Sequence, residues 1–242
     1  MPAPKQSKHK VTKGRSAANS RIVIYGEGGI GKTTLCSLAP KPLIIDLQDG
    51  SWDLDVDRIQ GVDTFDSLLE ILRDDELLRP YETIVVDTAT DAQDLAIAYA
   101  CRKNGWKSIE DPGYGKGYRF AYEQFELLLA AGDRISRSGK RFVLVCHDTT
   151  VAVPHPSGED YLCYQPSLMN AGKTALIRDR VKGWCDHLLF LRRDVSVDKN
   201  RKAKTGERYI WPQGDATFWA KSRRLRDEIE FSEGSTELWD QL

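Results

Sequence analysis

A glycine-rich turn follows the first apolar segment of the chain and ends in Lys32, Thr33 and Thr34. From Gly26 to Thr33 it has the spacing G-x-x-x-x-G-K-[ST], which between a strand and a helix is typical of a phosphate-binding loop. Lys32 is expected to reach the terminal phosphates of a nucleotide, and the Thr33 hydroxyl is expected to ligate Mg²⁺. The alternative, a chance glycine turn before a helix, is disfavoured by the apolar strand at 22–24. The predicted phosphate-binding residues form one run: Gly26, Glu27, Gly28, Gly29, Ile30, Gly31, Lys32, Thr33 and Thr34.

Polar residues also end three later apolar segments. Asp46 follows residues 43–45, Asp87 follows residues 83–86, and His147 follows residues 142–146. In a parallel sheet, ligands bind beyond the carboxyl ends of the strands, so these side chains are expected near the phosphate loop. Asp87 has the form of the acid that holds Mg²⁺ in phosphate-loop enzymes, and the alternative is an ordinary cap of the next helix.

The order of the segments indicates an α/β fold. Strands are expected at 22–24, 43–46, 83–87, 141–146 and 186–192, and helices at 32–39, 65–78, 91–101 and 119–137. Residues 148–175 hold several prolines and are expected to be irregular, whereas the stretches around Val195 and 209–211 flank a basic turn and predict a C-terminal β-hairpin. Such alternation predicts a mostly parallel sheet covered by helices on both faces.

Composition limits the class of protein. The chain has 242 residues, 40% of them hydrophobic, which suffices for one α/β domain with a core. No apolar run reaches the length of a membrane span, and no signal peptide is visible. The five cysteines form no C-x-x-C pair, which indicates reduced thiols in a cytoplasmic protein.

Charge divides the chain into three parts. Residues 1–20 hold five Lys or Arg residues and no acid, which predicts a disordered basic arm. Residues 21–226 are expected to form the catalytic domain. Residues 227–242 hold six acids and no base, and an unstructured acidic tail is the simpler interpretation.

Taken together, these motifs resemble the RecA-like ATPases, and most closely the phage-encoded branch of Sak-type single-strand annealing proteins or recombinases. The resemblance spans about residues 21–226, and five segments carry it in the same order: 25–35, 39–46, 83–88, 142–147 and 220–223. It implies a RecA-like P-loop NTPase fold in which the strand at 141–146 lies between those at 22–24 and 83–87. It further implies ATP and Mg²⁺ as ligands and the cytoplasm of the host cell as location.

The resemblance also assigns roles to individual residues. His147 stands where relatives carry a polar sensor of the γ-phosphate. Lys221 and Arg223 look like the pair that some RecA-like rings insert into a neighbour's site, although a solvated basic segment is the alternative. Relatives place a water-activating Glu where this chain has Gln48, followed by Asp49. Because Gln is a poor base, slow hydrolysis is expected unless Asp49 takes over. The candidate catalytic residues are therefore Lys32, Gln48, Asp49, Asp87, His147, Lys221 and Arg223.

Single-stranded DNA is the partner that the resemblance implies, with a homo-oligomeric ring or filament and a single-strand-binding protein as further partners. Three segments are candidates for the contact with DNA: the arm at 1–20, the turn at 199–204, and the loop with Tyr114, Lys116, Tyr118 and Arg119. Two other functions stay open. One is a nucleotide-gated scaffold that hydrolyses little, and the other is a small-molecule phosphotransferase.

Overall fold

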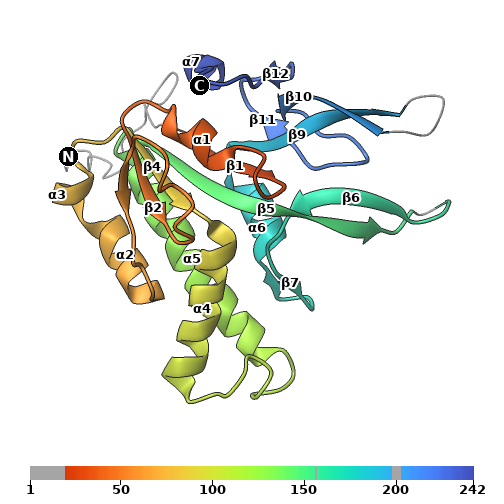
Figure 1. The fold of residues 1–242 in the computed structure, drawn as a ribbon. Coiled ribbons are helices and arrows are strands. Elements are labelled where there is room, and N and C mark those ends of the chain that lie inside the picture. Colours follow the sequence, from red (N-terminus) through yellow and green to blue (C-terminus); the bar gives the residue numbers. More distant parts are fainter. Residues whose placement is uncertain (1–19, 156, 198–202) are drawn as a thin grey trace, which may run out of the picture.

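The computed structural model describes residues 20–155, 157–197 and 203–242. Its main sheet is mixed and mostly parallel, and the phosphate loop follows a strand in its middle (Figure 1). The six parallel strands run in the order β3 (Asp57–Ile59), β2 (Pro42–Asp46), β4 (Thr83–Asp87), β5 (Arg141–Val153), β1 (Arg21–Gly26) and β9 (His187–Val197). Because β5 pairs with both β1 and β4, the expected insertion of this strand beside the phosphate-loop strand is confirmed.

Side chains alternate along each central strand and form two cores. Val23 and Tyr25 face one core, whereas Ile22 and Ile24 face the other. The first core is covered by α2 (Phe65–Arg73), α3 (Asp75–Leu78), α4 (Ala89–Asn104), α5 (Lys116–Arg137) and α6 (Ile177–Trp184), and the second by α1 (Lys32–Ser37) and α7 (Glu237–Gln241). The predicted α/β class with helices on both faces is therefore confirmed.

The predicted single helix over 65–78 is two helices. Asp74 has an extended backbone and its carboxylate accepts hydrogen bonds from the backbone N–H groups of Glu76 and Leu77 at 3.1 and 3.0 Å. This cap satisfies the N-terminus of α3 and so ends α2.

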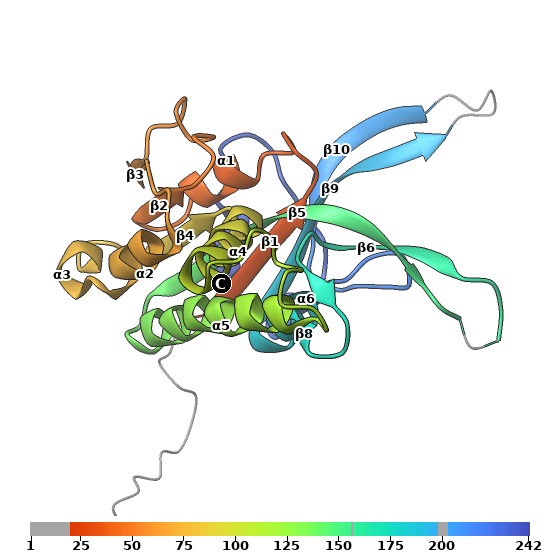
Figure 2. The ribbon, with the colours of Figure 1, turned by 90° about the horizontal axis from the view of Figure 1, so that it is seen from below.

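Residues 148–175 are not irregular. β5 continues to Val153 and pairs with the antiparallel strand β6 (Tyr161–Pro166), and the short strands β7 (Asn170–Ala171) and β8 (Ala175–Leu176) follow. The prediction was wrong because Pro154 lies just after β5 and Pro166 is the last residue of β6, so neither interrupts the pairing, whereas Thr149 to Val153 favour extended backbone. The predicted C-terminal hairpin is confirmed as β9 and β10 (Ala203–Trp211). Figure 2 shows both hairpins extending beyond the helices on the same side of the molecule.

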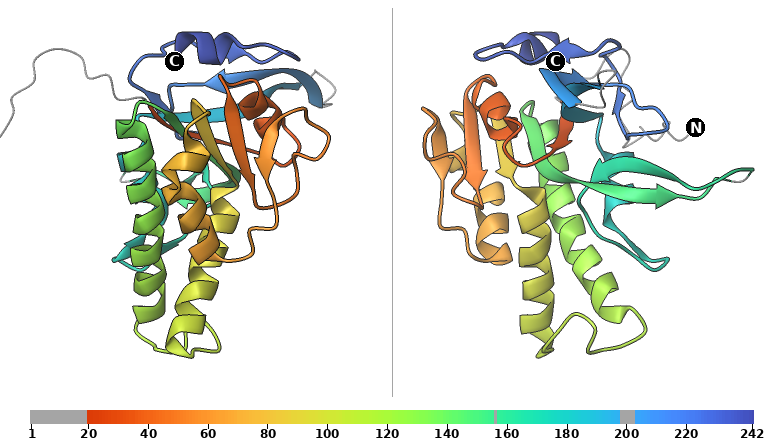
Figure 3. Two further views of the ribbon diagram at one scale, coloured as in Figure 1. Left: turned by 90° about the vertical axis from the view of Figure 1, so that its left-hand side faces the viewer. Right: turned by 45° about the vertical axis from the view of Figure 1, so that its right-hand side comes forward.

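The acidic segment 227–242 is not an unstructured tail. β12 (Ile229–Glu230) pairs with β10, and the Trp239 indole N–H donates to the backbone carbonyl of Leu35 in α1 at 2.8 Å. Figure 3 shows this segment lying across the sheet on the α1 side. The charge count misled because its acids are exposed while its apolar residues are buried: Ile229, Phe231, Leu238, Trp239 and Leu242.

The basic arm at 1–19 and most of the turn at 199–204 lie outside the described residues. Within the described part of the chain, no helix is long and apolar enough to cross a membrane.

Candidate nucleotide-binding site

Two glycines of the phosphate loop lie where a side chain would clash. A Cβ on Gly26 would come within 2.2 Å of the backbone oxygen of Leu191 in β9. Gly31, which precedes α1, has φ 106°, and a Cβ there would lie 2.7 Å from Nη1 of Arg208. The turn can therefore lie against β9 and β10 only with glycine at these positions.

Lys32 is buried at the first turn of α1, with 6% of its surface exposed. Its ammonium donates to the backbone carbonyls of Gly26 and Glu27 at 2.8 and 2.7 Å. Burial lowers the pKa of Lys32, and the charge of Asp87 opposes this shift. A buried cation of this kind, set among loop backbone groups, fits the phosphates of a nucleotide.

Thr33 and Asp87 meet at the end of β4. The Thr33 hydroxyl donates to a carboxylate oxygen of Asp87 at 2.6 Å. Burial raises the pKa of Asp87 to about 6, although the bond from Thr33 lowers it. A hydroxyl and a buried carboxylate are oxygen ligands of the type Mg²⁺ takes, and a cation here would offset the burial of the charge. These two residues would hold the ion, as the sequence predicts.

Gln48 and His147 line the candidate site from the two sides of β4: Gln48 follows β2, whereas His147 lies in β5, in register with Gly26 at the start of the phosphate loop. The side-chain nitrogen of Gln48 is 3.2 Å from Nε2 of His147, which is half-buried. The loop that carries Gln48 is held by Asp46, whose carboxylate accepts from the backbone N–H groups of Gln48, Gly50 and Ser51. Burial raises the pKa of Asp46, but these bonds and the Ser51 hydroxyl outweigh it and leave the pKa lowered. Asp46 is thus a brace for the Gln48 loop.

A cavity of about 370 Å³ joins these groups. Its lining includes Gly28, Gly29, Gly31, Lys32, Thr33, Thr34, Gln48, Gly50, Asp53, Leu54, Asp87, Thr88 and His147. Four of the candidate catalytic residues are therefore brought together with the loop. Asp53 is a carboxylate that sequence reasoning missed, because it lies in an irregular turn without a motif.

Three candidate residues lie elsewhere. Asp49 is turned away from the cavity, and its carboxylate accepts from the Gln60 side chain at 2.9 Å. Lys221 belongs to β11 (Lys221–Ser222), which pairs with the first residues of β9 at the opposite end of the sheet from the phosphate loop. Arg223 lies there too, 73% exposed and 3.1 Å from Asp186. Neither can reach the cavity of its own chain.

The predicted DNA-binding loop at 114–119 is mostly helical: Tyr114 precedes α5, whereas Lys116, Tyr118 and Arg119 belong to its first turn. Tyr114 is fully exposed, the Tyr118 hydroxyl donates to Glu110 at 2.9 Å, and Arg119 pairs with Glu123. Figure 1 shows this end of the α4–α5 helix pair and the β9–β10 hairpin pointing in different directions.

Comparison with known proteins identifies the family of this chain. Among solved structures, the chain is similar to the KaiC-like protein PH0186 from the hyperthermophilic archaeon Pyrococcus horikoshii OT3, with 13% sequence identity and a TM-score of 0.45 over 89% of this chain and 86% of that chain. No curated protein matches the chain. A family model described as an AAA domain matches residues 18–224. The chain, with its buried phosphate-loop lysine and strand-end Asp87, belongs to this AAA domain family and is a P-loop ATPase.

Proposed function

We propose that this P-loop ATPase is an Mg²⁺-dependent enzyme that acts on single-stranded DNA in phage recombination or annealing. One observation carries the proposal: His147 lines the nucleotide cavity and is continuous with the β5–β6 hairpin. A change at the γ-phosphate can therefore pass along the backbone of β5 to the β5–β6 hairpin. This hairpin projects from the molecule (Figure 2) and is available to contact DNA.

Each of the cavity residues has a distinct role in phosphoryl transfer. Lys32 and the N–H groups of the loop bind the phosphates, and Thr33 and Asp87 hold Mg²⁺. When bound, Mg²⁺ neutralises charge that develops on the transferred phosphoryl group. A ring N–H of His147 donates to the γ-phosphate and reports its loss.

Gln48 orients the attacking water in this proposal. An amide holds water by hydrogen bonds but does not remove its proton, so turnover is slow. Of the carboxylates that line the cavity, that of Asp53 is nearest to Gln48 in the sequence. The Asp49 carboxylate instead accepts a hydrogen bond from the Gln60 side chain outside the cavity.

Lys221 and Arg223 act on a neighbouring subunit in this proposal. Their distance from their own phosphate loop, at the opposite end of the sheet, suits residues that complete the next site in a ring or filament. Cations placed there stabilise charge on the transferred phosphoryl group. A single-strand-binding protein is a further partner of such an assembly.

Binding of single-stranded DNA tests the proposal. Fluorescence anisotropy of a labelled oligonucleotide is measured over a salt series, without nucleotide, with ATP and with a non-hydrolysable analogue. Affinity should rise with ATP and fall with salt, because phosphate contacts release counterions. If the oligonucleotide does not bind in any of these conditions, the proposal is wrong.

A nucleotide-gated scaffold is the second candidate, and Gln48 is the observation that favours it. A scaffold binds ATP and assembles but turns over little. Steady-state turnover separates the two, since a scaffold hydrolyses little with or without DNA. Mass measurements with ATP, with the analogue and with DNA test what they share, since a monomer in all conditions removes both the scaffold and the roles of Lys221 and Arg223.

A further inference from the structure

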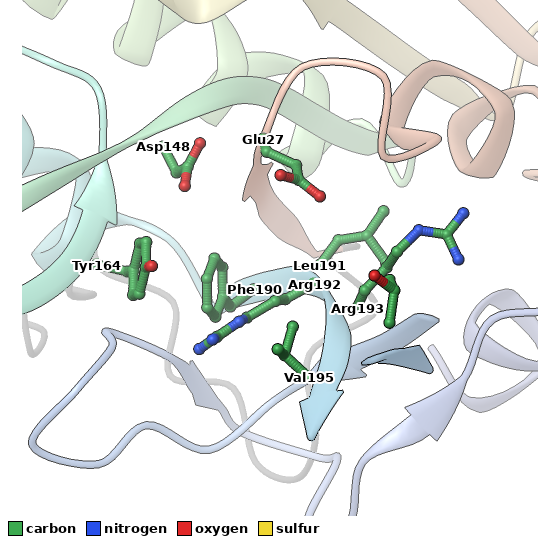
Figure 4. A pocket seen from close by; sticks show the side chains of 9 residues that line it. Glu27, Asp148, Tyr164, Phe190, Leu191, Arg192, Arg193 and Val195 are labelled. Carbon is green, nitrogen blue, oxygen red and sulfur yellow. The ribbon is translucent and has the colours of Figure 1, made fainter. Parts of the chain in front are cut away.

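A second cavity, of about 250 Å³, lies next to the phosphate loop on the side of β9 (Figure 4). Glu27 of the loop and Asp148, which follows His147, lie on one side of it, and Tyr164, Phe190 and Arg192 lie on the other. It shares none of its lining with the nucleotide cavity. At this volume it is smaller than the usual pocket for a drug-sized ligand and suits a single ring system.

The aromatic side of this cavity is rigid. Phe190 stacks on the buried ring of Tyr25 at 4.7 Å and on Tyr164 at 5.5 Å between ring centroids. The Tyr25 hydroxyl lies 3.2 Å from the backbone oxygen of Tyr164, which ties β6 to β1. The Arg192 guanidinium lies 5.1 Å from the centre of the Tyr164 ring. Together these groups form a preorganised surface for a flat, polarisable ring.

The opposite side of the cavity offers hydrogen-bond acceptors. Glu27 and Asp148 place two carboxylates in the lining, where N–H donors would be bound, and Arg192 and Arg193 balance their charge. Nucleobases with an exocyclic amino group supply such donors together with a stacking face. A base can therefore find both a stacking face and hydrogen-bond acceptors in the cavity.

A neighbouring cavity of about 240 Å³, also lined by β9, again combines aromatic rings with arginine side chains. It shares Phe190 and Arg192 with the first cavity and adds the rings of Trp211 and Phe218, which are 5.7 Å apart. Phe218 in turn lies 5.2 Å from Phe190. Two adjacent ring-sized cavities on one aromatic row fit successive bases of a strand better than one isolated side chain.

From these observations we infer that the cavity between the β5–β6 and β9–β10 hairpins binds an unstacked base of single-stranded nucleic acid, with Tyr164 and Arg192 as its stacking wall. This inference deepens the proposed function and rests on it. A bound base would contact Glu27 of the phosphate loop and Asp148 beside the sensor His147, so base binding and nucleotide binding would be coupled through adjacent residues.

The test compares two probes of equal length, a fluorescein-labelled oligodeoxycytidylate and its abasic counterpart. Both carry the same phosphates, and only the first has bases. The wild-type protein with ATP should bind the base-containing probe at least about fivefold more tightly, as expected for one stacked base. Tyr164→Leu and Arg192→Gln should weaken that binding by about the same factor and remove most of the preference.

Matched controls lie on the same strand and elsewhere on the surface. Tyr161→Leu changes the same residue type on β6, three positions earlier and thus on the other face of the strand, and should keep the preference. Arg73→Gln removes one exposed positive charge from α2 and should also keep it. Binding of a fluorescent ATP analogue verifies that each variant is folded.

The outcomes separate the two ideas. If the wild type binds neither probe, the proposed action on single-stranded DNA fails and the inference fails with it. If the wild type binds both probes equally, or Tyr164→Leu keeps the preference, the base cavity is wrong while DNA binding stands. If Tyr164→Leu changes only the mass of the assembly, the cavity receives a second copy of the chain, which also overturns the inference.

Discussion

Gln48 and His147 meet across the end of β4. Gln48 follows β2 and His147 belongs to β5, and β4 lies between these strands, so their contact at 3.2 Å spans the strand that ends in Asp87. Both side chains line the nucleotide cavity together with Lys32. At position 48 itself, where the attacking water is expected, the chain therefore has an amide beside an imidazole.

Replacement of the phosphate-loop lysine should weaken nucleotide binding. Lys32→Ala removes the buried ammonium that donates to the loop carbonyls, so ATP affinity is expected to fall at least about tenfold, the loss of a hydrogen-bonded charge. Titration with a fluorescent ATP analogue measures this. Lys103→Ala, an exposed lysine on α4, should bind as the wild type does, and equal loss in both variants would contradict the assignment.

A carboxylate at position 48 should accelerate hydrolysis. Gln48→Glu would place a general base beside His147, and base catalysis typically contributes about 10²–10⁴-fold. We expect kcat to rise at least about tenfold, within that contribution. The matched control is Gln60→Glu, because Gln60 bonds to Asp49 outside the cavity. Unchanged turnover in Gln48→Glu would show that position 48 does not face the water.

Asp87 should make both stability and Mg²⁺ binding depend on pH. Its pKa in the folded protein is about 6, above the ordinary 3.8, so the folded state holds its proton longer than the unfolded state. Stability of the nucleotide-free protein should therefore decrease as pH rises from about 4 to 6. Mg²⁺-dependent binding of ATP should follow the opposite course and weaken below about pH 6, because a protonated carboxyl is a poor ligand.

Asp87→Asn isolates this effect. The variant should be about 1–2 kcal/mol more stable than the wild type at neutral pH, since it lacks the buried charge, and should lose Mg²⁺-dependent turnover. Urea unfolding at pH 4 and pH 7 measures the first effect. A stability difference that does not change between the two pH values would rule out Asp87 as its source, and Asp63→Asn on the surface is the control.

Trp239 should contribute strongly to folding. It is 3% exposed, packs on α1 and donates to the Leu35 carbonyl, so Trp239→Ala is expected to cost about 3–5 kcal/mol. Trp239→Phe, which keeps most of the packing but loses the N–H donor, should cost about 1–2 kcal/mol. Trp52→Ala is the control, because Trp52 is 74% exposed and should change stability by less than about 0.5 kcal/mol. If the Trp239 and Trp52 substitutions change the free energy of unfolding equally, residues 227–242 would behave as an unstructured tail, which would contradict the packing of Trp239 on α1.

The sequence predicted most of the fold and the centre of the site. The spacing of the loop, the strand ending in Asp87 and the apolar run before His147 are local signals, and the parallel sheet brings them together as expected, although β5 continues past His147. Arg208, whose guanidinium donates to the Ile30 carbonyl at 3.2 Å, carried no such signal because its contact spans 178 residues. The packing of Trp239 on α1 is likewise a contact between segments far apart in the sequence. The sequence prediction missed it because the acidic residues of this segment drew more weight than its scattered apolar residues.

Steady-state ATP turnover with and without single-stranded DNA tests the account most directly, in the wild type and in His147→Ala. The account predicts that saturating oligonucleotide raises kcat of the wild type, while His147→Ala still binds ATP but loses the stimulation, because His147 connects the cavity to the β5–β6 hairpin. Wild-type turnover that is the same with and without DNA, or full stimulation in His147→Ala, would contradict it.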